Sequence, residues 1–86
     1  MHEVTKVVPT THHRLILTFE NNETKVIDLS SELFGVFEYL KDPAFFNSVT
    51  LVRGAPTWHP PNGEMEIDLC PDALYTDSIP FEEVPA

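Results

Sequence analysis

The chain has 86 residues, of which 42% are hydrophobic, eight are proline, three are glycine and one is cysteine. This length allows one domain with a thin core, and the hydrophobic content argues against disorder. The formal net charge of −9 is uneven, because residues 1–53 hold seven acids and five bases whereas residues 54–86 hold seven acids and no lysine or arginine. A strongly acidic surface repels phosphates, so direct binding to nucleic acid is not expected. Solubility or attraction to a basic protein is the expected use of this charge.

The cellular compartment is predicted from what the chain lacks. No apolar run exceeds three residues, and a membrane span needs about 20, so no transmembrane segment is expected. Residues 1–6 show no basic region leading into an apolar stretch, so no secretory signal is expected. Cys70 is alone and cannot form an internal disulfide. These features favour the cytoplasm.

The first part of the chain has strand patterns, and strands are predicted over residues 4–8, 14–20 and 24–28. The first strand ends at Pro9, which cannot donate to a sheet ladder, and a polar turn follows over residues 10–13. The second strand alternates with period two, which places on one face Leu15, Leu17 and Phe19. Asn21 and Asn22 tolerate the positive φ of a tight turn, so the second and third strands are expected to form a hairpin.

Residues 29–40 change to helical spacing. The apolar residues at that spacing are Leu29, Leu33, Phe37 and Leu40, with Phe34 near the same stripe. Ser30 or Ser31 is expected to cap the start, and Gly35 to divide the segment into two short pieces. Asp42 and Pro43 predict a second helical start that continues to residue 46, since Asp is a good N-cap and Pro loses nothing at the first helical position.

The last part of the chain returns to strands, and these are predicted over residues 48–53, 57–59 and 64–69, with a break at 54–56. The alternation is cleanest in the last of them, where Met65, Ile67 and Leu69 are expected to face the core. One helical turn is predicted over residues 71–75, followed from Thr76 by an extended and partly frayed tail. The whole pattern predicts an α+β fold with a small antiparallel sheet of five or six short strands and two or three short helices. It is expected to form one domain over residues 1–80, with a flexible acidic tail over residues 81–86.

Three carboxylates share the other face of the predicted strand over residues 64–69: Glu64, Glu66 and Asp68. A solvated face is one interpretation and a partner-binding surface is the functional one, whereas side chains on a flat strand diverge too much to hold a cation. Trp58 lies beside an Asn-Gly loop and is either a binding platform or an aromatic that closes the edge of the core. The candidate partner-binding residues are therefore Glu64, Glu66, Asp68 and Trp58.

Catalytic and metal-binding patterns are weak. His59, Asp68 and Cys70 can act as ligands, yet they lack the spacing of a zinc site, and a small buried filler is the expected role of Cys70. Glycine-rich phosphate loops and serine elbows do not occur in the sequence. We expect no catalytic residue, no metal and no cofactor, and whether His59, Asp68 and Cys70 converge in space stays open.

An ordered set of segments over about residues 4–80 carries a family resemblance. These segments are Val4 to Pro9, Leu15 to Asn21, Val26 to Leu29, Gly35 to Leu40, Asp42-Pro43, Phe45-Phe46, Trp58, Asn62-Gly63 and Asp68 to Tyr75. In order and spacing they resemble the small prokaryotic family catalogued as domain of unknown function 2442. Residues 59–61 and 64–67 lengthen the last predicted hairpin relative to that family.

The resemblance implies a small α+β fold, no established activity and no catalytic residues to carry over. Family members look like accessory or regulatory modules, some of them in an antitoxin-like arrangement beside another small protein. We therefore expect a non-enzymatic interaction or regulatory module that binds a basic protein partner, with strand addition or self-pairing as a natural binding mode. The alternative is a small-molecule or metal-binding protein, or an enzyme with its site at a dimer interface, which would use His59, Trp58, Asp68 and Cys70.

Overall fold

The computed structural model describes residues 2–61, 63 and 65–83 of the chain. In this part of the chain, seven strands form two antiparallel sheets. The four-stranded sheet has the order β1-β2-β3-β7, with bounds β1 Val4–Thr10, β2 Arg14–Phe19, β3 Thr24–Asp28 and β7 Ile79–Pro80. The three-stranded sheet has the order β4-β5-β6, with bounds β4 Thr50–Val52, β5 Ala55–Trp58 and β6 Ile67–Asp68. The α+β class is confirmed, while the strands are more numerous than expected and divide between two sheets.

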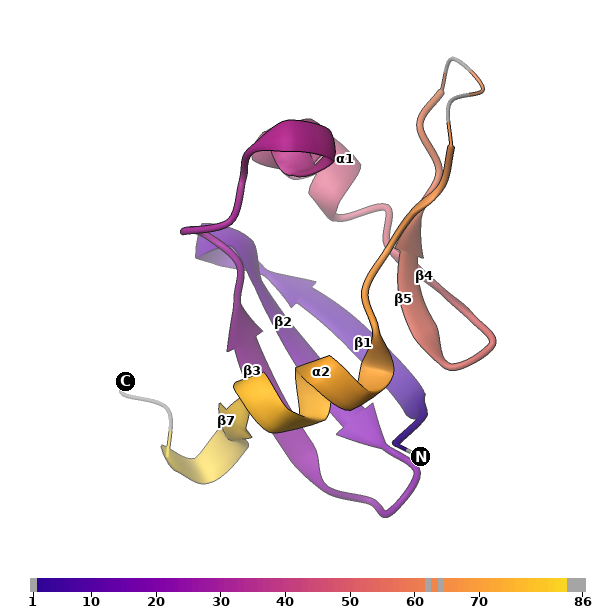
Figure 1. Ribbon diagram of the computed structural model, residues 1–86. Helices are drawn as coiled ribbons and strands as arrows, with labels where there is room; N and C mark the ends of the chain where they lie inside the picture. The colour runs from indigo at the N-terminus through magenta and orange to yellow at the C-terminus, as the bar shows by residue number, and fades with distance from the viewer. Residues whose placement is uncertain (1, 62, 64, 84–86) are drawn as a thin grey trace.

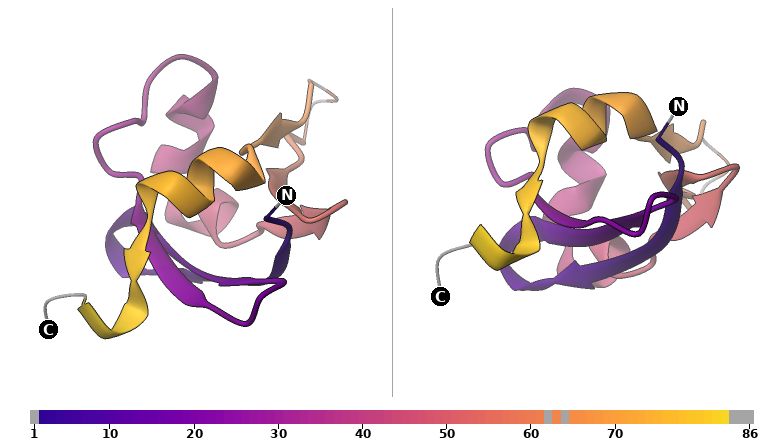
Figure 2. Two further views of the ribbon diagram at one scale, coloured as in Figure 1. Left: turned by 60° about the horizontal axis from the view of Figure 1, so that its bottom comes forward. Right: turned by 90° about the horizontal axis from the view of Figure 1, so that it is seen from below.

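Two short α-helices and three 3₁₀ helices connect the described strands. The α-helices are α1 Pro43–Phe46 and α2 Pro71–Asp77, and the 3₁₀ helices are Thr11–His13, Gly35–Lys41 and Phe81–Glu83. Helix α2 lies across the four-stranded sheet (Figure 1). The N-terminus lies beside the start of α2 in both views of Figure 2.

The core forms on one face of β2, as the period-two pattern predicts. Leu15, Leu17 and Phe19 are each 0% exposed, and the residues between them are half-buried. Other elements cover this face with the buried side chains Leu40, Phe46, Trp58, Ile67 and Leu74. Burial of each large aliphatic or aromatic side chain contributes about 1.5–3 kcal/mol, so this cluster holds the two sheets and the helices together.

The predicted hairpin of β2 and β3 is confirmed. Leu15 is opposite Ile27 and Leu17 is opposite Lys25 in its register. Asn22 has a φ of 68°, which lies in the left-handed region that asparagine tolerates in a tight turn. The strand β1 differs from the prediction because it continues through Pro9 to Thr10. It is an edge strand, where the missing N–H of a proline is tolerated.

The strand β5 begins at Ala55, inside the break that was predicted over residues 54–56. Val52 pairs with Ala55 across a two-residue turn, and in that turn Arg53 and Gly54 have φ values of 52° and 77°. A two-residue turn with positive φ at both positions matches the right-handed twist of the two strands that it joins. The Gly54 carbonyl accepts a hydrogen bond from Val4 N–H at 2.9 Å, and a Cβ atom at Gly54 would lie 2.8 Å from the Cβ atom of Glu3. The turn therefore attaches the three-stranded sheet to the start of β1, which local sequence does not reveal.

The helical prediction over residues 29–40 is correct only in its second half. The Ser30 N–H donates to the Asp28 carboxylate at 2.9 Å instead of starting a helix, and helical structure begins only at Gly35, whose φ is 60°. The predicted helix start at Asp42 is confirmed, because its carboxylate accepts a hydrogen bond from Ala44 N–H at 3.1 Å.

Two predictions about the end of the chain are wrong in extent. Among the described residues 65–69 of the strand predicted over 64–69, only Ile67 and Asp68 form a strand, which pairs with Trp58 and Thr57. Met65 is 90% exposed instead of facing the core. Nor is the chain frayed from Thr76, because α2 continues to Asp77 and β7 then pairs with β3. Of the predicted tail over residues 81–86, residues 81–83 form one 3₁₀ turn, and residues 84–86 lie outside the described part of the chain.

Candidate interaction surface

The predicted acidic strand is exposed where the structure describes it. Glu66 and Asp68 are both exposed, and Asp68 lies on β6 at the edge of the three-stranded sheet. Glu64, the third carboxylate of the prediction, and Asn62 in the predicted turn lie outside the described residues. The two described carboxylates are therefore accessible to a partner.

Trp58 lies in the core, so its prediction as a partner-binding residue is wrong. The side chain is 0% exposed, and its indole N–H donates to the Phe46 carbonyl at 2.9 Å. Its ring also stacks on the ring of Phe46, with the ring centres 5.8 Å apart. A buried indole with its N–H satisfied inside the protein serves as a packing centre and offers no surface to a partner.

The ligand-capable residues named from the sequence do not form a metal site in the structure. Cys70 is exposed at the start of α2, so its prediction as a buried filler is wrong. His59 is also exposed, and its Nε2 atom lies 3.5 Å from the Thr50 hydroxyl. Among residues 2–61, 63 and 65–83, no group of three or more His, Cys, Asp or Glu side chains is placed to hold a metal ion.

Negative charge in the last third of the chain is not balanced by lysine or arginine. Among the described residues, the lysine and arginine side chains that form ion pairs are Arg14, with Asp28, and Lys41, with Glu38. Of the later carboxylates, Asp72 lies 3.4 Å from the ring nitrogen Nδ1 of His2. The exposed carboxylates after residue 54 include Glu66, Asp68, Asp72, Asp77 and Glu82. This part of the surface therefore presents acids that a basic molecule can neutralise.

A polar cluster around Tyr75 was not predicted from the sequence. The Tyr75 hydroxyl donates to the Glu23 carboxylate, and Lys25 donates to the Tyr75 carbonyl at 2.6 Å while lying 4.1 Å from the centre of its ring. The imidazole of His2 stacks on the Tyr75 ring at 3.8 Å, and the His2 backbone N–H donates to Asp72 at 2.8 Å. These residues lie in the N-terminal segment, the β2–β3 hairpin and α2, so no local pattern in the sequence indicates the cluster.

The hydrogen bonds of this cluster shift the pKa values of its members. The hydroxyl of Tyr75 lowers the pKa of Glu23, and the same bond raises the pKa of Tyr75. The backbone N–H of His2 lowers the pKa of Asp72. Because these groups are paired with one another, the cluster is a structural link between α2 and the sheet, with little capacity left for a ligand.

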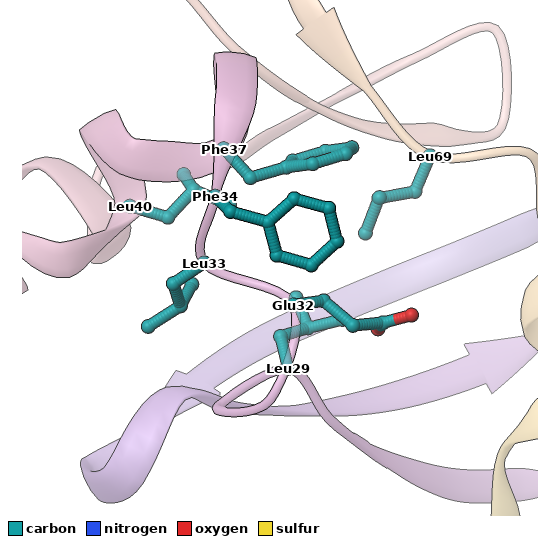
Figure 3. Close-up of a pocket in the computed structure, with 7 residues that line it drawn as sticks. All are labelled: Leu29, Glu32, Leu33, Phe34, Phe37, Leu40 and Leu69. Atoms are coloured by element: carbon teal, nitrogen blue, oxygen red, sulfur yellow. The ribbon is translucent and has the colours of Figure 1, made fainter.

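An apolar hollow of about 130 Å³ lies between the segment over residues 29–34, the 3₁₀ helix Gly35–Lys41 and Leu69, which follows β6. Its lining residues are Leu29, Glu32, Leu33, Phe34, Phe37, Leu40 and Leu69 (Figure 3). Phe34 is 68% exposed, although its ring lies over this hollow between Phe37 and Glu32 in the same view. An aromatic side chain this exposed beside an apolar hollow is a feature of binding surfaces.

A second hollow of about 170 Å³ adjoins the first and shares with it the wall residues Leu29, Glu32 and Leu69. The remaining residues of the second hollow are Ile27, Cys70, Ala73, Leu74 and Asp77. We call the two hollows together the Phe34 groove. Its lining contains two acids, Glu32 and Asp77, and no lysine, arginine or histidine. The helical spacing of apolar residues over 29–40 indicated this apolar stripe, but it did not indicate that part of the stripe is exposed to solvent.

Comparison of the chain with protein-family models, with curated proteins and with solved structures finds no match in any of the three. In the part of the chain that the structure describes, no helix is both long and apolar enough to span a bilayer.

Proposed function

We propose that the chain is a non-enzymatic interaction module, with a regulatory or antitoxin-like role, that binds a basic protein partner. The observation that supports this function is the unbalanced charge of the last third of the chain. No lysine or arginine follows Arg53, and the described acids there make no ion pair with such a base. An acidic surface of this kind attracts a basic protein and speeds their encounter.

Of the four residues that the alternative, catalytic or metal-binding site would use, Trp58 is not accessible to a ligand. Trp58 is buried as a packing centre, and the polar cluster of Tyr75 satisfies its own members. The proposal places the contact at exposed carboxylates, among them Glu66 and Asp68, and places the protein in the cytoplasm because its one cysteine has no internal partner. The resemblance to domain of unknown function 2442 remains a prediction and is not needed for this function.

Affinity purification of the full chain from its native host, followed by quantitative mass spectrometry, tests the proposed function. The partner is expected to be basic, to be recovered at low salt and to be lost as salt is raised, because screening weakens attraction between exposed charges. The paired substitution Glu66→Gln and Asp68→Asn should reduce its recovery. Failure to recover a specific partner at low salt, or recovery of an acidic partner at all salt concentrations, would contradict the proposal.

A further inference from the structure

We propose that the Phe34 groove receives an amphipathic helix of the basic partner, with two bulky apolar side chains one turn apart in the two hollows and lysine or arginine beside Glu32 and Asp77. This inference rests on the proposed function and adds the recognition site and the chemistry of the segment that fills it.

The size of each hollow fits one apolar side chain. The hollows measure about 130 and 170 Å³, and a protein cavity of roughly 150 Å³ accepts a molecule the size of benzene. The two hollows share a wall of Leu29, Glu32 and Leu69, so their occupants must be neighbours. Side chains at positions i and i+4 of a helix lie about 6 Å apart on one face, which meets this requirement.

Charge at the groove selects a basic helix over an acidic one. Glu32 belongs to the lining of both hollows and Asp77 to that of the second, whereas the lining contains no cationic side chain. Both acids are exposed, so they can meet lysine or arginine at the rim. A helix that carries glutamate in those places would be repelled.

Phe34 supplies the apolar contact that docking would complete. Most of its ring is in water in the free chain, with an exposed fraction of 68%. An apolar side chain that enters the hollow beneath this ring removes apolar surface of both molecules from water, which is favourable in proportion to the area buried. The same contact explains why a phenylalanine is used at an exposed position beside Glu32.

Titration of the ¹⁵N-labelled full chain with three matched helical peptides tests the inference. The first peptide has two leucines one turn apart and lysines around them, the second has serines in place of the leucines, and the third has glutamates in place of the lysines. The leucine–lysine peptide is expected to bind about tenfold or more tightly than either control, since it alone provides both the apolar and the charged contacts. Its amide shift changes should include Leu29, Phe34 and Leu69.

Two pairs of variants separate the groove from general charge attraction. Phe34→Ala should weaken the leucine–lysine peptide several-fold, whereas Met65→Ala, which also removes an exposed apolar side chain, should have no effect. Glu32→Gln with Asp77→Asn should weaken binding more than Glu66→Gln with Asp68→Asn, although each pair removes two negative charges.

The outcomes distinguish the groove from the proposed function. Equal binding of the leucine–lysine and serine–lysine peptides, with no effect of Phe34→Ala, overturns the groove and leaves binding to a basic partner standing. Equal binding of the leucine–lysine and leucine–glutamate peptides overturns both. Shift changes centred on the exposed Val8 and Ile79 of the four-stranded sheet would also overturn the groove.

Discussion

Replacement of Trp58 by phenylalanine removes an indole N–H from the centre of the core. In the structure this group donates to the Phe46 carbonyl at 2.9 Å, and the whole side chain is 0% exposed. Loss of a buried hydrogen bond costs about 1 kcal/mol, and the weak second donor to this carbonyl, Val49 N–H at 3.4 Å, keeps the cost from rising further. The smaller ring leaves a void that costs about 1 kcal/mol more. We expect Trp58→Phe to lower the free energy of unfolding by about 2 kcal/mol.

This loss is a large fraction of the stability expected for a chain of this size, which is about 4–13 kcal/mol. It corresponds to a fall in Tm of roughly 8–16 °C. Urea unfolding followed by far-ultraviolet circular dichroism is the suitable assay, because the variant has lost its only tryptophan. Met65→Ala, at a side chain that is 90% exposed, is the control and should change stability by less than about 0.5 kcal/mol.

A loss below about 0.5 kcal/mol for Trp58→Phe, with an unchanged m value, would refute the reasoning. It would mean that the indole is not hydrogen-bonded in the core, and Trp58 would return as a candidate for partner contact. The folded variant is expected to keep its affinity for the leucine–lysine peptide, because the indole does not line the Phe34 groove.

Three further substitutions test local features of the fold. Gly54→Ala should cost about 2 kcal/mol or more in urea unfolding, because alanine disfavours the φ of 77° and its Cβ would lie 2.8 Å from that of Glu3; a loss below about 0.5 kcal/mol would contradict this. Asp42→Ala should cost about 1 kcal/mol through the lost N-cap of α1, and Asp42→Asn should restore most of it. Tyr75→Phe should destabilise the chain at pH 7, and its difference from the wild type should shrink as the pH falls below about 4.3.

The sign of the pH dependence follows from the two shifted pKa values in the Tyr75–Glu23 pair. The folded chain lowers the pKa of Glu23, so the stabilisation is present above the pKa of the unfolded chain and is lost as the pH falls through the folded value. The folded chain raises the pKa of Tyr75, so the same stabilisation is present below the unfolded pKa and is lost as the pH rises through the folded value. A difference between Tyr75→Phe and the wild type that stays constant from pH 7 to pH 3 would contradict the pairing.

The parts of the fold that could be predicted are those set by neighbouring residues. The β2–β3 hairpin follows from period-two alternation and from an asparagine that accepts a φ of 68°. The start of α1 follows from Asp42 and Pro43. The Asp42 carboxylate accepts a hydrogen bond from a backbone N–H at the helix start, and Pro43 has no N–H that would need a partner there. In both cases the determining contacts lie within a few residues of one another.

The parts that could not be predicted depend on contacts between distant residues. The turn at Gly54 is fixed by its approach to Glu3, and the cluster of Tyr75 joins residues from three elements. The alternation of apolar residues predicted that Met65 faces the core, but in this segment only Ile67 and Asp68 pair with another strand. A strand pattern without a neighbouring strand to pair with does not bury its apolar face.

The negative charge of the candidate site could be predicted from the sequence, but the position of the Phe34 groove could not. The excess of acids after residue 54 is visible in the sequence, and Glu66 and Asp68 are exposed in the structure. The Phe34 groove brings residues from 27–40 together with residues from 69–77, and this juxtaposition depends on the packing of α2. Sequence periodicity identifies an apolar stripe but does not show which part of it stays open.

Hydrogen–deuterium exchange of the full chain with and without its co-purified basic partner tests the central claim most directly. We predict that the partner slows exchange in residues 29–34 and 69–77, which line much of the Phe34 groove, and leaves the amide of Trp58 in the core unchanged. Protection confined to β1 and β7, with no change in either groove segment, would show that the partner binds the four-stranded sheet and would contradict the account.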